Sequence, residues 1–429
     1  MLMSKVTIYG KNISECGYCK NKDGTKNETS VSYGVDADKM EVEHYETMML
    51  RGWRRSGTYL YKPSLHETCC PPYTIRLENK KFITSKAHRQ LIRRISRYLT
   101  TGSIYETRDE TIPISTHNLT VETTLPEYTD ERYALYLKYQ TLIHHDNPEE
   151  KSKKGKLPYK NRFHYLTKNL WWLLLLGFIS FLVESPLKHK LITKTNTIEA
   201  SNSNTLELPS IQLKSSENLC YGTFHQLYRL DGLLVAVGVI DILPSGISSV
   251  YLFYDPDYKF LELGKYTALN EIKFCLDNNE YNFNYYYMGF YIHSCQKMKY
   301  KGEYYPSELM CPSTFNWYPI LECIPLVTKY GFTPFHHELI IIRERIFKEN
   351  LKGNQLLKEL EKLLPQNLIQ YDRILFPVDV SLMPLCISNT ITKFDDITNR
   401  GKTILSPILT EWGNLIGNIL ASKIIIKLN

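Results

Sequence analysis

"LLVAVGVIDILPSGISSVYLFY", residues 233–254, decides the fold that the sequence predicts. Its first run, 233–243, and its last, 248–254, are rich in β-branched and aromatic residues, which favour strands. The "PSGI" between the two runs is a turn signal. The stretch therefore predicts two paired antiparallel strands.

The residues that follow extend this pair into a layer. "LGKYTALNEIKFCL" (263–276) predicts a helix, because one apolar face forms from residues three or four positions apart, namely Tyr266, Leu269, Ile272 and Leu276. "NYYYMGFYI" (284–292) predicts another strand. The order strand, strand, helix, strand indicates a mixed α/β layer.

Length and composition favour a folded protein with more than one domain. The 429 residues give room for two or three domains, and 43% hydrophobic with 23% charged residues is typical of globular chains. We expect an amino-terminal cysteine-rich, basic domain (1–145), then a linker with an apolar helix and a mobile loop (146–218). A mixed α/β core (219–320) follows, with a helical or extended carboxy-terminal region (321–429) that could complete it.

Several segments outside the core also carry predictions. Polar composition predicts a linker or loop over 145–162 and a mobile loop over 193–210. Spacing and a final proline predict a helix over 339–365. Residues 373–384 and the isoleucine-rich end are open between strand, helix and partner contact.

One apolar segment raises the question of a membrane. "LWWLLLLGFISFLV" (170–183) has 14 residues, which reach about 21 Å as a helix, whereas the hydrocarbon core of a bilayer is roughly 30 Å thick. We therefore predict a buried core helix, with membrane contact as the alternative.

The amino terminus lacks the apolar core of a secretory signal, which favours a reducing compartment where the ten cysteines are thiols or metal ligands.

Two cysteine pairs are candidate metal ligands. Cys16 and Cys19 form a C-x-x-C pair, and the vicinal Cys69 and Cys70 follow about fifty residues later. Four thiolates can bind zinc or an iron–sulfur cluster. Because adjacent cysteines can both bind one ion only with an unusual local backbone, His66 is a substitute fourth ligand. A redox dithiol, or unrelated buried thiols, is the alternative.

Basic residues gather in two places, and the formal net charge of +7 permits a polyanionic partner. The stretch 85–99 predicts a helix whose apolar stripe contains Leu91, Ile95, Tyr98 and Leu99, and whose basic stripe contains Lys86, Arg89, Arg93 and Arg97. A second cluster lies among aromatic residues upstream: Arg51, Arg54, Arg55 and Lys62. Together with Arg76, these side chains are candidate nucleic-acid contacts, although a solvated charged face is the alternative.

Long motifs in both halves carry a family resemblance. The amino-terminal half contains CGYC (16–19), "YGVDADKMEVEHYETMMLRGWRRSGTYLYKP" (33–63) and "CCPPYTIRL" (69–77), and the centre contains "FLVESPL" (181–187). The carboxy-terminal half contains "YGTFHQLYRLDGLLVAVGVIDILP" (221–244), "YYYMGFYIHSCQKMKYKGEYYPSEL" (285–309) and "PSTFNWYP" (312–319). With these motifs in order, the sequence resembles the eukaryotic arginyl-tRNA–protein transferases.

The resemblance implies an α+β protein with an amino-terminal metal- or cluster-binding domain and an acetyltransferase-like (GNAT-like) mixed α/β acyltransferase domain. It implies transfer of arginine from Arg-tRNA to the α-amine of proteins that begin with Asp, Glu or oxidised Cys, which marks them for N-degron degradation in the cytoplasm or nucleus. The implied partners are Arg-tRNA, such proteins and the ubiquitin-ligase machinery. A non-catalytic, metal-stabilised RNA-binding protein on the same scaffold is the alternative.

This reaction needs no ATP, because the tRNA ester is already activated, and the sequence has no phosphate-binding loop of the G-x-x-x-x-G-K-[ST] type. A carboxylate that positions the amine and takes its proton would suffice. Asp241, at the end of the first predicted strand, is our candidate, and Asp255 is the second choice. Either residue could instead cap a turn.

The remaining candidates would bind substrate. An acidic first residue calls for fixed cations, and alternation in an extended "KMKYKG" would place Lys297, Lys299 and Lys301 on one face, around Tyr300. The same lysines could instead hold the tRNA end. Hydroxyl donors for the substrate or its oxyanion are Ser245, Ser248 and Ser249, with ordinary hairpin-turn serines as the alternative. Candidates for contact with the arginyl adenosine are His225 and Gln226, with a hydrogen-bonded core histidine as the alternative.

Overall fold

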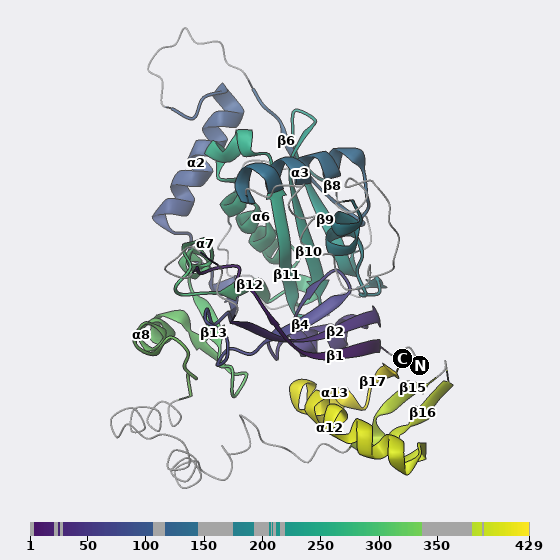
Figure 1. The fold of residues 1–429 in the computed structure, drawn as a ribbon. Helices are drawn as coiled ribbons and strands as arrows, with labels where there is room; N and C mark the ends of the chain where they lie inside the picture. Colours follow the sequence, from purple (N-terminus) through teal and green to yellow (C-terminus); the bar gives the residue numbers. More distant parts are fainter. Residues whose placement is uncertain are drawn as a thin grey trace. The chain divides into compact units, whose positions relative to one another are not determined.

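The computed structural model describes residues 4–20, 25, 29–105, 116–144, 175–192, 206, 208, 212–214, 219–336, 380–387 and 390–428 (Figure 1). The chain divides into two compact units. Unit 1 comprises Met1–Arg55, Tyr59–Arg76 and Gly289–Asn429, and unit 2 comprises Ser56–Thr58 and Leu77–Met288. The division differs from the predicted boundaries at 145, 218 and 320, because each unit is built from segments that are far apart in the sequence.

The sheet of unit 2 contains the predicted hairpin. Its strand order is β12-β11-β10-β9-β6-β8, and β7 also pairs with β9. The bounds are β6 Leu119–Thr124, β7 Lys190–Leu191, β8 Gln212–Lys214, β9 Cys220–Leu230, β10 Leu233–Leu243, β11 Gly246–Tyr254 and β12 Tyr285–Tyr291. The antiparallel pair β10–β11 confirms the prediction, although β11 begins two residues earlier than expected. The third predicted strand is β12, which runs parallel to β11.

Helices cover both faces of this sheet. Every residue of β10 after Leu233 is buried, which requires cover on both sides. On one face, Val237 and Val239 pack against Leu135 of α3 (Asp130–His144) and against Leu182 of the π-helix η3 (Ile179–Val183). On the other face, α6 (Leu263–Asp277) brings Glu271 to Gly238. Unit 2 also contains the long helix α2 (Lys86–Thr101).

The predicted core helix at 170–183 is confirmed where the structure describes it. Residues 175–183 are helical, and Phe178 and Leu182 are 0% and 1% exposed. Among the described residues, no helix is long and apolar enough to cross a membrane. The linker over 145–162, the helix over 339–365 and almost all of the loop over 193–210 lie outside the described residues.

The pairing of β11 with β12 stops early. It joins Gly246, Ile247 and Ser248 to 285–287, whereas β11 continues to Tyr254. We call the end of this pairing the β11–β12 fork. Gly246 is required here, because its φ is +153° and a Cβ would lie 1.8 Å from the carbonyl oxygen of Tyr285. The fork therefore begins at a close backbone approach that other residues would block.

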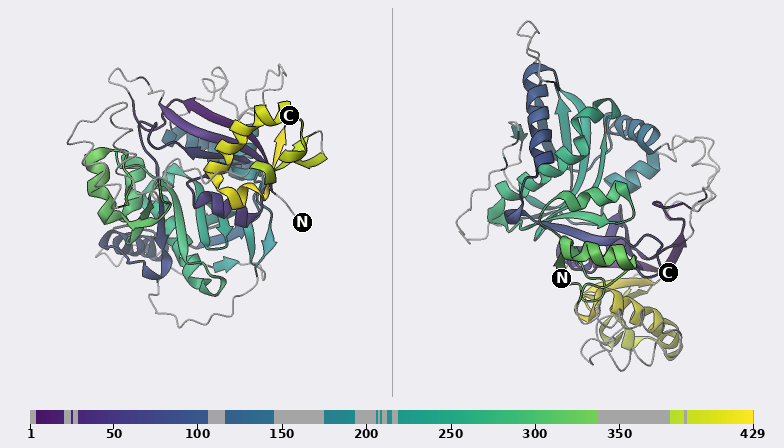
Figure 2. Two further views of the ribbon diagram at one scale, coloured as in Figure 1. Left: turned by 90° about the horizontal axis from the view of Figure 1, so that it is seen from below. Right: turned by 90° about the vertical axis from the view of Figure 1, so that its left-hand side faces the viewer.

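Unit 1 contains a seven-stranded sheet that uses both ends of the chain (Figure 2). The strand order is β16-β15-β17-β1-β2-β4-β3, with bounds β1 Ser4–Ser14, β2 Ser30–Lys39, β3 Arg54–Ser56, β4 Tyr59–Pro63, β15 Pro384–Ile387, β16 Thr390–Lys393 and β17 Ile424–Leu428. The strand β17 runs parallel to β1, with Ser4 opposite Ile424 and Val6 opposite Ile426. The isoleucine-rich end is thus a strand.

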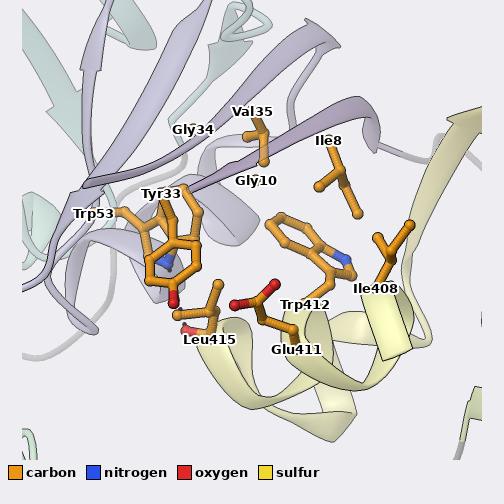
Figure 3. A pocket seen from close by; sticks show the side chains of 10 residues that line it. All are labelled: Ile8, Gly10, Tyr33, Gly34, Val35, Trp53, Ile408, Glu411, Trp412 and Leu415. Atoms are coloured by element: carbon orange, nitrogen blue, oxygen red, sulfur yellow. Dashed lines mark hydrogen bonds between the residues drawn. The ribbon is translucent and has the colours of Figure 1, made fainter. Parts of the chain in front are cut away.

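The helix α12 (Asn399–Ile416) holds the carboxy-terminal segment on this sheet. Its Trp412 meets Trp53 edge-on, with ring centroids 5.7 Å apart, and both indoles are buried. Figure 3 shows these two rings and Tyr33 around a hollow between β1, β2 and α12, with Glu411 beside them. Edge-to-face aromatic packing adds to the burial of apolar area, so this contact fixes α12.

The remaining helices and strands are short. Within unit 1 they are α1 Val42–Met49, α7 Gln296–Lys299, η6 Tyr300–Glu303, β13 Ser307–Met310, β14 Trp317–Pro319, α8 Ile320–Tyr330, η7 Val380–Leu382, η8 Phe394–Asp396 and α13 Asn418–Ala421. Within unit 2 they are η1 Asn79–Lys81, η4 Pro256–Leu261 and η5 Asn279–Tyr281. Strand β5 (Tyr73–Glu78) begins in unit 1 and ends in unit 2.

Candidate functional sites

The sheet of unit 1 brings the two cysteine pairs together. Ser14, at the end of β1, lies opposite Ser30 of β2. Ser32, also of β2, lies opposite Pro63 at the end of β4. The loops that leave β1 and β4 therefore start side by side. Beyond β4, the Cys69 N–H donates to the carbonyl of Thr29 at 3.1 Å, which ties the second loop to the first.

The four predicted thiols form one group. The Sγ atoms of Cys16, Cys19, Cys69 and Cys70 all lie within 4.8 Å of one another, and the Cys19 and Cys69 sulfurs are 3.5 Å apart. A tetrahedral ion bound to four sulfurs at about 2.3 Å places them about 3.8 Å apart, so the group fits one metal ion. Both vicinal cysteines belong to the group, and His66, which is exposed, does not.

Apolar groups of the carboxy-terminal half cover these thiols. Cys16 and Cys70 pack with the buried Ile292, and Cys295 and Met298 pack against the same cluster. Burial raises the pKa of the Cys70 thiol. Burial also acts to raise the pKa of Cys16, but backbone N–H groups of Cys19 and Tyr18 lower it overall. The lower pKa of Cys16 increases its share of thiolate, the form that binds metals.

The lysines of "KMKYKG" lie next to this cluster, but not as predicted. We expected an extended segment, and this is wrong: 296–299 form α7 and 300–303 form η6, since the N–H groups of Met298 and Lys299 both donate to the carbonyl of Cys295. Lys297 and Lys299 are exposed. Lys301 instead donates to the carbonyl of Phe290 at 3.0 Å, and burial, with the nearby Arg54, lowers its pKa to about 8.

The predicted basic stripe is present on α2. Lys86, Arg89 and Arg93 are exposed and Arg97 is half-buried, whereas Leu91 and Ile95 on the opposite side are buried. Ser85 caps the helix by accepting from the His88 N–H at 3.1 Å, and Gly102 ends it in the left-handed conformation. The helix thus holds a row of cations at helical spacing toward solvent.

The second predicted cluster of cations is divided between surface and interior. Arg51 and Lys62 both lie over the ring of Phe315, 5.0 Å from its centroid. Arg76 pairs with Glu308 at 2.8 Å. Arg54 and Arg55 are buried, at 6% and 5% exposed, and Arg54 donates to the carbonyls of Met49 and Trp53. The structure therefore uses Arg54 to satisfy backbone carbonyls inside unit 1.

Asp241 lies inside β10 with no exposed surface, at the inner end of a chain of hydroxyl groups. The Thr223 hydroxyl donates to it at 2.7 Å, and the Ser185 Oγ is 2.6 Å from that hydroxyl. The Leu187 N–H donates to Ser185 Oγ at 3.2 Å, so the serine proton is free to point to Thr223. Because Ser185 is half-buried, the chain links a fully buried carboxylate to a more accessible hydroxyl.

Asp255 and Ser245 have identified partners, and Ser248 is buried. Asp255 accepts from the Asp257 N–H at 3.0 Å, which caps η4, and pairs with Lys138 at 2.6 Å. Ser245 Oγ is 2.8 Å from the hydroxyl of Tyr287, and Ser248 is 1% exposed. Asp255 is therefore placed as the turn cap that the sequence left open as an alternative.

His225 and Gln226 point to opposite faces of β9. His225 is fully buried: Arg132 donates to its Nδ1 at 3.1 Å, so its Nε2 carries the proton and donates to the carbonyl of Leu182 at 2.9 Å. Gln226 accepts from the Tyr228 hydroxyl at 3.2 Å. Both side chains thus have partners inside unit 2.

Sequence reasoning missed Glu271. Its signal was an acid between Leu269 and Ile272 of the predicted apolar face, and the structure buries it at 2% exposed. Among the described residues, its Oε2 finds no hydrogen-bond partner. Burial raises its pKa to about 7, and the hydroxyls of Tyr286 and Ser249 only partly offset this rise. A buried carboxylate without full compensation destabilises the fold, so it is unlike an ordinary core residue.

The raised pKa of Glu271 makes the folding stability depend on pH. Between the ordinary value of 4.5 and about 7, the folded chain holds a proton that the unfolded chain releases, so stability falls as pH rises through this window. Glu271→Gln removes this effect. The free energy of unfolding, measured with urea, should favour the variant over the unaltered protein by about 2 kcal/mol more at pH 8 than at pH 5. Asp277→Asn, exposed on the same helix, should gain much less. An equal gain in both variants would contradict the assignment.

The thiol group predicts metal binding that one substitution weakens. Cys19→Ser removes one of four ligands and should lower both the zinc content after reconstitution and the thermal midpoint of unfolding. Zinc content is measured by mass spectrometry of the purified chain. Cys220→Ser, outside the group, serves as the control and should keep full zinc content. Full metal content in the Cys19 variant would refute the ligand assignment.

Two family models match the chain. The model described as "Arginine-tRNA-protein transferase, N terminus" matches residues 14–90, and the one described as "Arginine-tRNA-protein transferase, C terminus" matches 131–311. The first range contains the four thiols and the α2 residues up to Gln90. The second contains Asp241, Thr223, Ser185 and Glu271.

Relatives agree with these models. The chain is 32% identical to arginyl-tRNA–protein transferase 1 of Drosophila melanogaster, over 76% of this chain and 84% of the relative. It is 28% identical to arginyl-tRNA–protein transferase 1 of Arabidopsis thaliana, over 76% and 74%. It is also 25% identical to an aspartate/glutamate leucyltransferase of Pseudomonas entomophila, over 72% and 95%. The chain belongs to the arginyl-tRNA–protein transferase family.

Proposed function

We propose that this enzyme transfers arginine from Arg-tRNA to the α-amine of proteins that begin with Asp, Glu or oxidised Cys. The observation that carries the proposal is the buried Asp241 linked through the Thr223 hydroxyl to Ser185, within the range that the carboxy-terminal family model matches. A relative named for aspartate and glutamate supports acidic acceptors. Unit 2, with its antiparallel strands, crossover helix and parallel β12, is proposed to be the GNAT-like acyltransferase core.

The hydroxyl chain suits the proton that the reaction releases. The α-amine attacks the arginyl carbonyl carbon, the new C–N bond forms, and the ester bond to the terminal ribose breaks. The amine loses one proton and the ribose oxygen gains one. Ser185 and Thr223 would relay the amine proton toward Asp241, so that the buried carboxylate needs no direct contact with the substrate.

The cations of both units are proposed contacts for the partners. The exposed row on α2, namely Lys86, Arg89, Arg93 and the half-buried Arg97, suits tRNA phosphates, as do Arg51 and Lys62. Arg76 remains a tRNA candidate, whereas Arg54 and Arg55 would act through the fold that they hold, since both are buried. Lys297 and Lys299 are proposed to receive the acidic first residue of the acceptor, with Tyr300 and Lys301 fixing their segment.

The metal centre would be structural. Within the described parts of the chain the group consists of four thiols alone, which as thiolates would fill a tetrahedral site, as is typical of structural zinc. A cluster that binds each thiolate to a different iron atom needs its sulfurs farther apart, so the spacing favours a single ion. Cys295 and Met298 of the lysine-bearing segment pack on the same thiols, so a bound ion would fix that segment.

Other family properties stay predictions from the resemblance. They are the oxyanion or substrate roles of Ser245, Ser248 and Ser249, the nucleotide contacts of His225 and Gln226, and the catalytic role of Asp255. N-degron degradation, the ubiquitin-ligase machinery as a partner and a cytoplasmic or nuclear location belong to the same group.

Replacing the buried carboxylate of Asp241 should slow arginine transfer without weakening the binding of tRNA. Asp241→Asn keeps the shape but removes the charge that accepts the proton, so single-turnover transfer of arginine from Arg-tRNA to a peptide beginning with Asp should fall at least tenfold. Filter binding should show unchanged affinity for tRNA. Asp257→Asn, an exposed acid that pairs with Lys138, is the control. Unchanged rates in the Asp241 variant would remove it from the mechanism, and tRNA binding without transfer in the unaltered protein would favour the non-catalytic alternative.

The acceptor proposal predicts a change of selectivity. Neutralising both Lys297 and Lys299 by Gln should lower the kcat/KM for a peptide beginning with Asp at least tenfold, because each charge-assisted bond contributes about 1.5–3 kcal/mol. The KM for Arg-tRNA should stay constant. Lys329→Gln, which neutralises an exposed lysine of α8, is the matched control. A rise in the KM for Arg-tRNA alone would assign the two lysines to the tRNA end instead.

A further inference from the structure

Glu271 occupies the β11–β12 fork. Ser249, whose hydroxyl is directed at the carboxylate, is the first residue of β11 beyond the paired stretch, and Tyr286, the second such hydroxyl, lies on β12 inside it. The carboxylate thus spans the two strands where their pairing ends. Gly238 gives it room from the sheet, because a Cβ there would lie 3.4 Å from Oε1.

No cation neutralises this carboxylate within the described part of the chain. The ion pairs found there do not include Glu271, and its Oε2 has no hydrogen-bond partner although the side chain is 2% exposed. A buried charge is retained in proteins when it is paired or when it binds something. An amide or an apolar residue at this position would destabilise the fold less than a carboxylate does. We therefore take the free oxygen as a sign of a ligand with a positive charge.

The groups around the carboxylate suit a planar cation. Tyr228, whose pKa is raised by burial and by the charges of Glu271 and Tyr266, lies close to it on the sheet side. The Tyr266 hydroxyl is also buried and, within the described segments, makes no hydrogen bond of ordinary geometry. A guanidinium donates two parallel hydrogen bonds to a carboxylate and packs flat on aromatic rings. A carboxylate with an open oxygen among tyrosines therefore matches arginine better than lysine or a neutral side chain.

We propose that Glu271 binds the guanidinium of the arginine carried by the tRNA and so selects the amino acid that is transferred. The inference rests on the proposed function. The acidic first residue of the acceptor would be repelled by this carboxylate, and of the two reacting residues only the donor arginine carries a side-chain cation. Glu271 is thus a specificity residue for the donor, and the fork is where the donor side chain ends.

Citrulline offers a direct test, because it has the size and shape of arginine but a neutral ureido group. Single-turnover rates are measured with the same tRNA charged with arginine or with citrulline, on a peptide beginning with Asp. The unaltered enzyme should prefer arginine at least tenfold. Glu271→Gln should reduce this preference at least tenfold, as expected for the loss of one charge-assisted hydrogen bond. Asp277→Asn, an exposed acid on the same helix, should leave the preference unchanged.

The ratio of the two rates separates recognition from folding. A variant that is merely misfolded loses transfer from both donors alike, so an unchanged arginine-to-citrulline ratio in the Glu271 variant overturns the inference while the proposed function stands. An unaltered enzyme that transfers from neither donor contradicts the proposed function, and the inference falls with it. Partial recovery of the preference in Glu271→Asp would support a role for the charge.

Discussion

Ten consecutive residues of β10 are shielded from water, and this constraint governs the chemistry of unit 2. A buried polar group destabilises a fold unless it finds a partner, so each polar side chain on this sheet must be satisfied from within. His225 is held between Arg132 and the carbonyl of Leu182, and Asp241 accepts from Thr223. Glu271 is an exception, because one of its oxygens has no hydrogen-bond partner among the residues that the structure describes. The same burial that makes hydroxyls necessary for Asp241 makes the open oxygen of Glu271 informative.

In unit 1, strand pairing rather than proximity in the sequence brings together the cysteines of the candidate metal centre. The C-x-x-C loop and the vicinal pair are separated by three strands and a helix, and the pairing of β2 with both β1 and β4 brings them together. The covering residues Ile292, Cys295 and Met298 come from far along the chain. Because ligands and cover come from distant segments, metal binding and the folding of unit 1 are coupled.

The sequence predicted the parts that depend on local pattern. The β10–β11 hairpin, α6, β12 and the stripe on α2 follow from alternation, turn residues and helical spacing, and they are confirmed. The group of four thiols could also be predicted from the sequence, since cysteine spacing is a strong signal. The "KMKYKG" segment was misread as extended, because alternating lysines fit a strand but the carbonyl of Cys295 starts a helical turn. Glu271 was missed, since an acid beside apolar residues gives no sign of how deeply the helix is buried.

The pairing of β17 with β1 has a consequence for how the protein is made. Residues up to 288, which include all of unit 2, leave the ribosome long before residue 424 does. The sheet of unit 1 therefore waits for the last strand, while its first strand has been outside since the start of synthesis. The amino-terminal thiols wait a shorter time, because their apolar cover comes from Ile292, Cys295 and Met298; until these residues are synthesised, the thiols are open to metal and to oxidant.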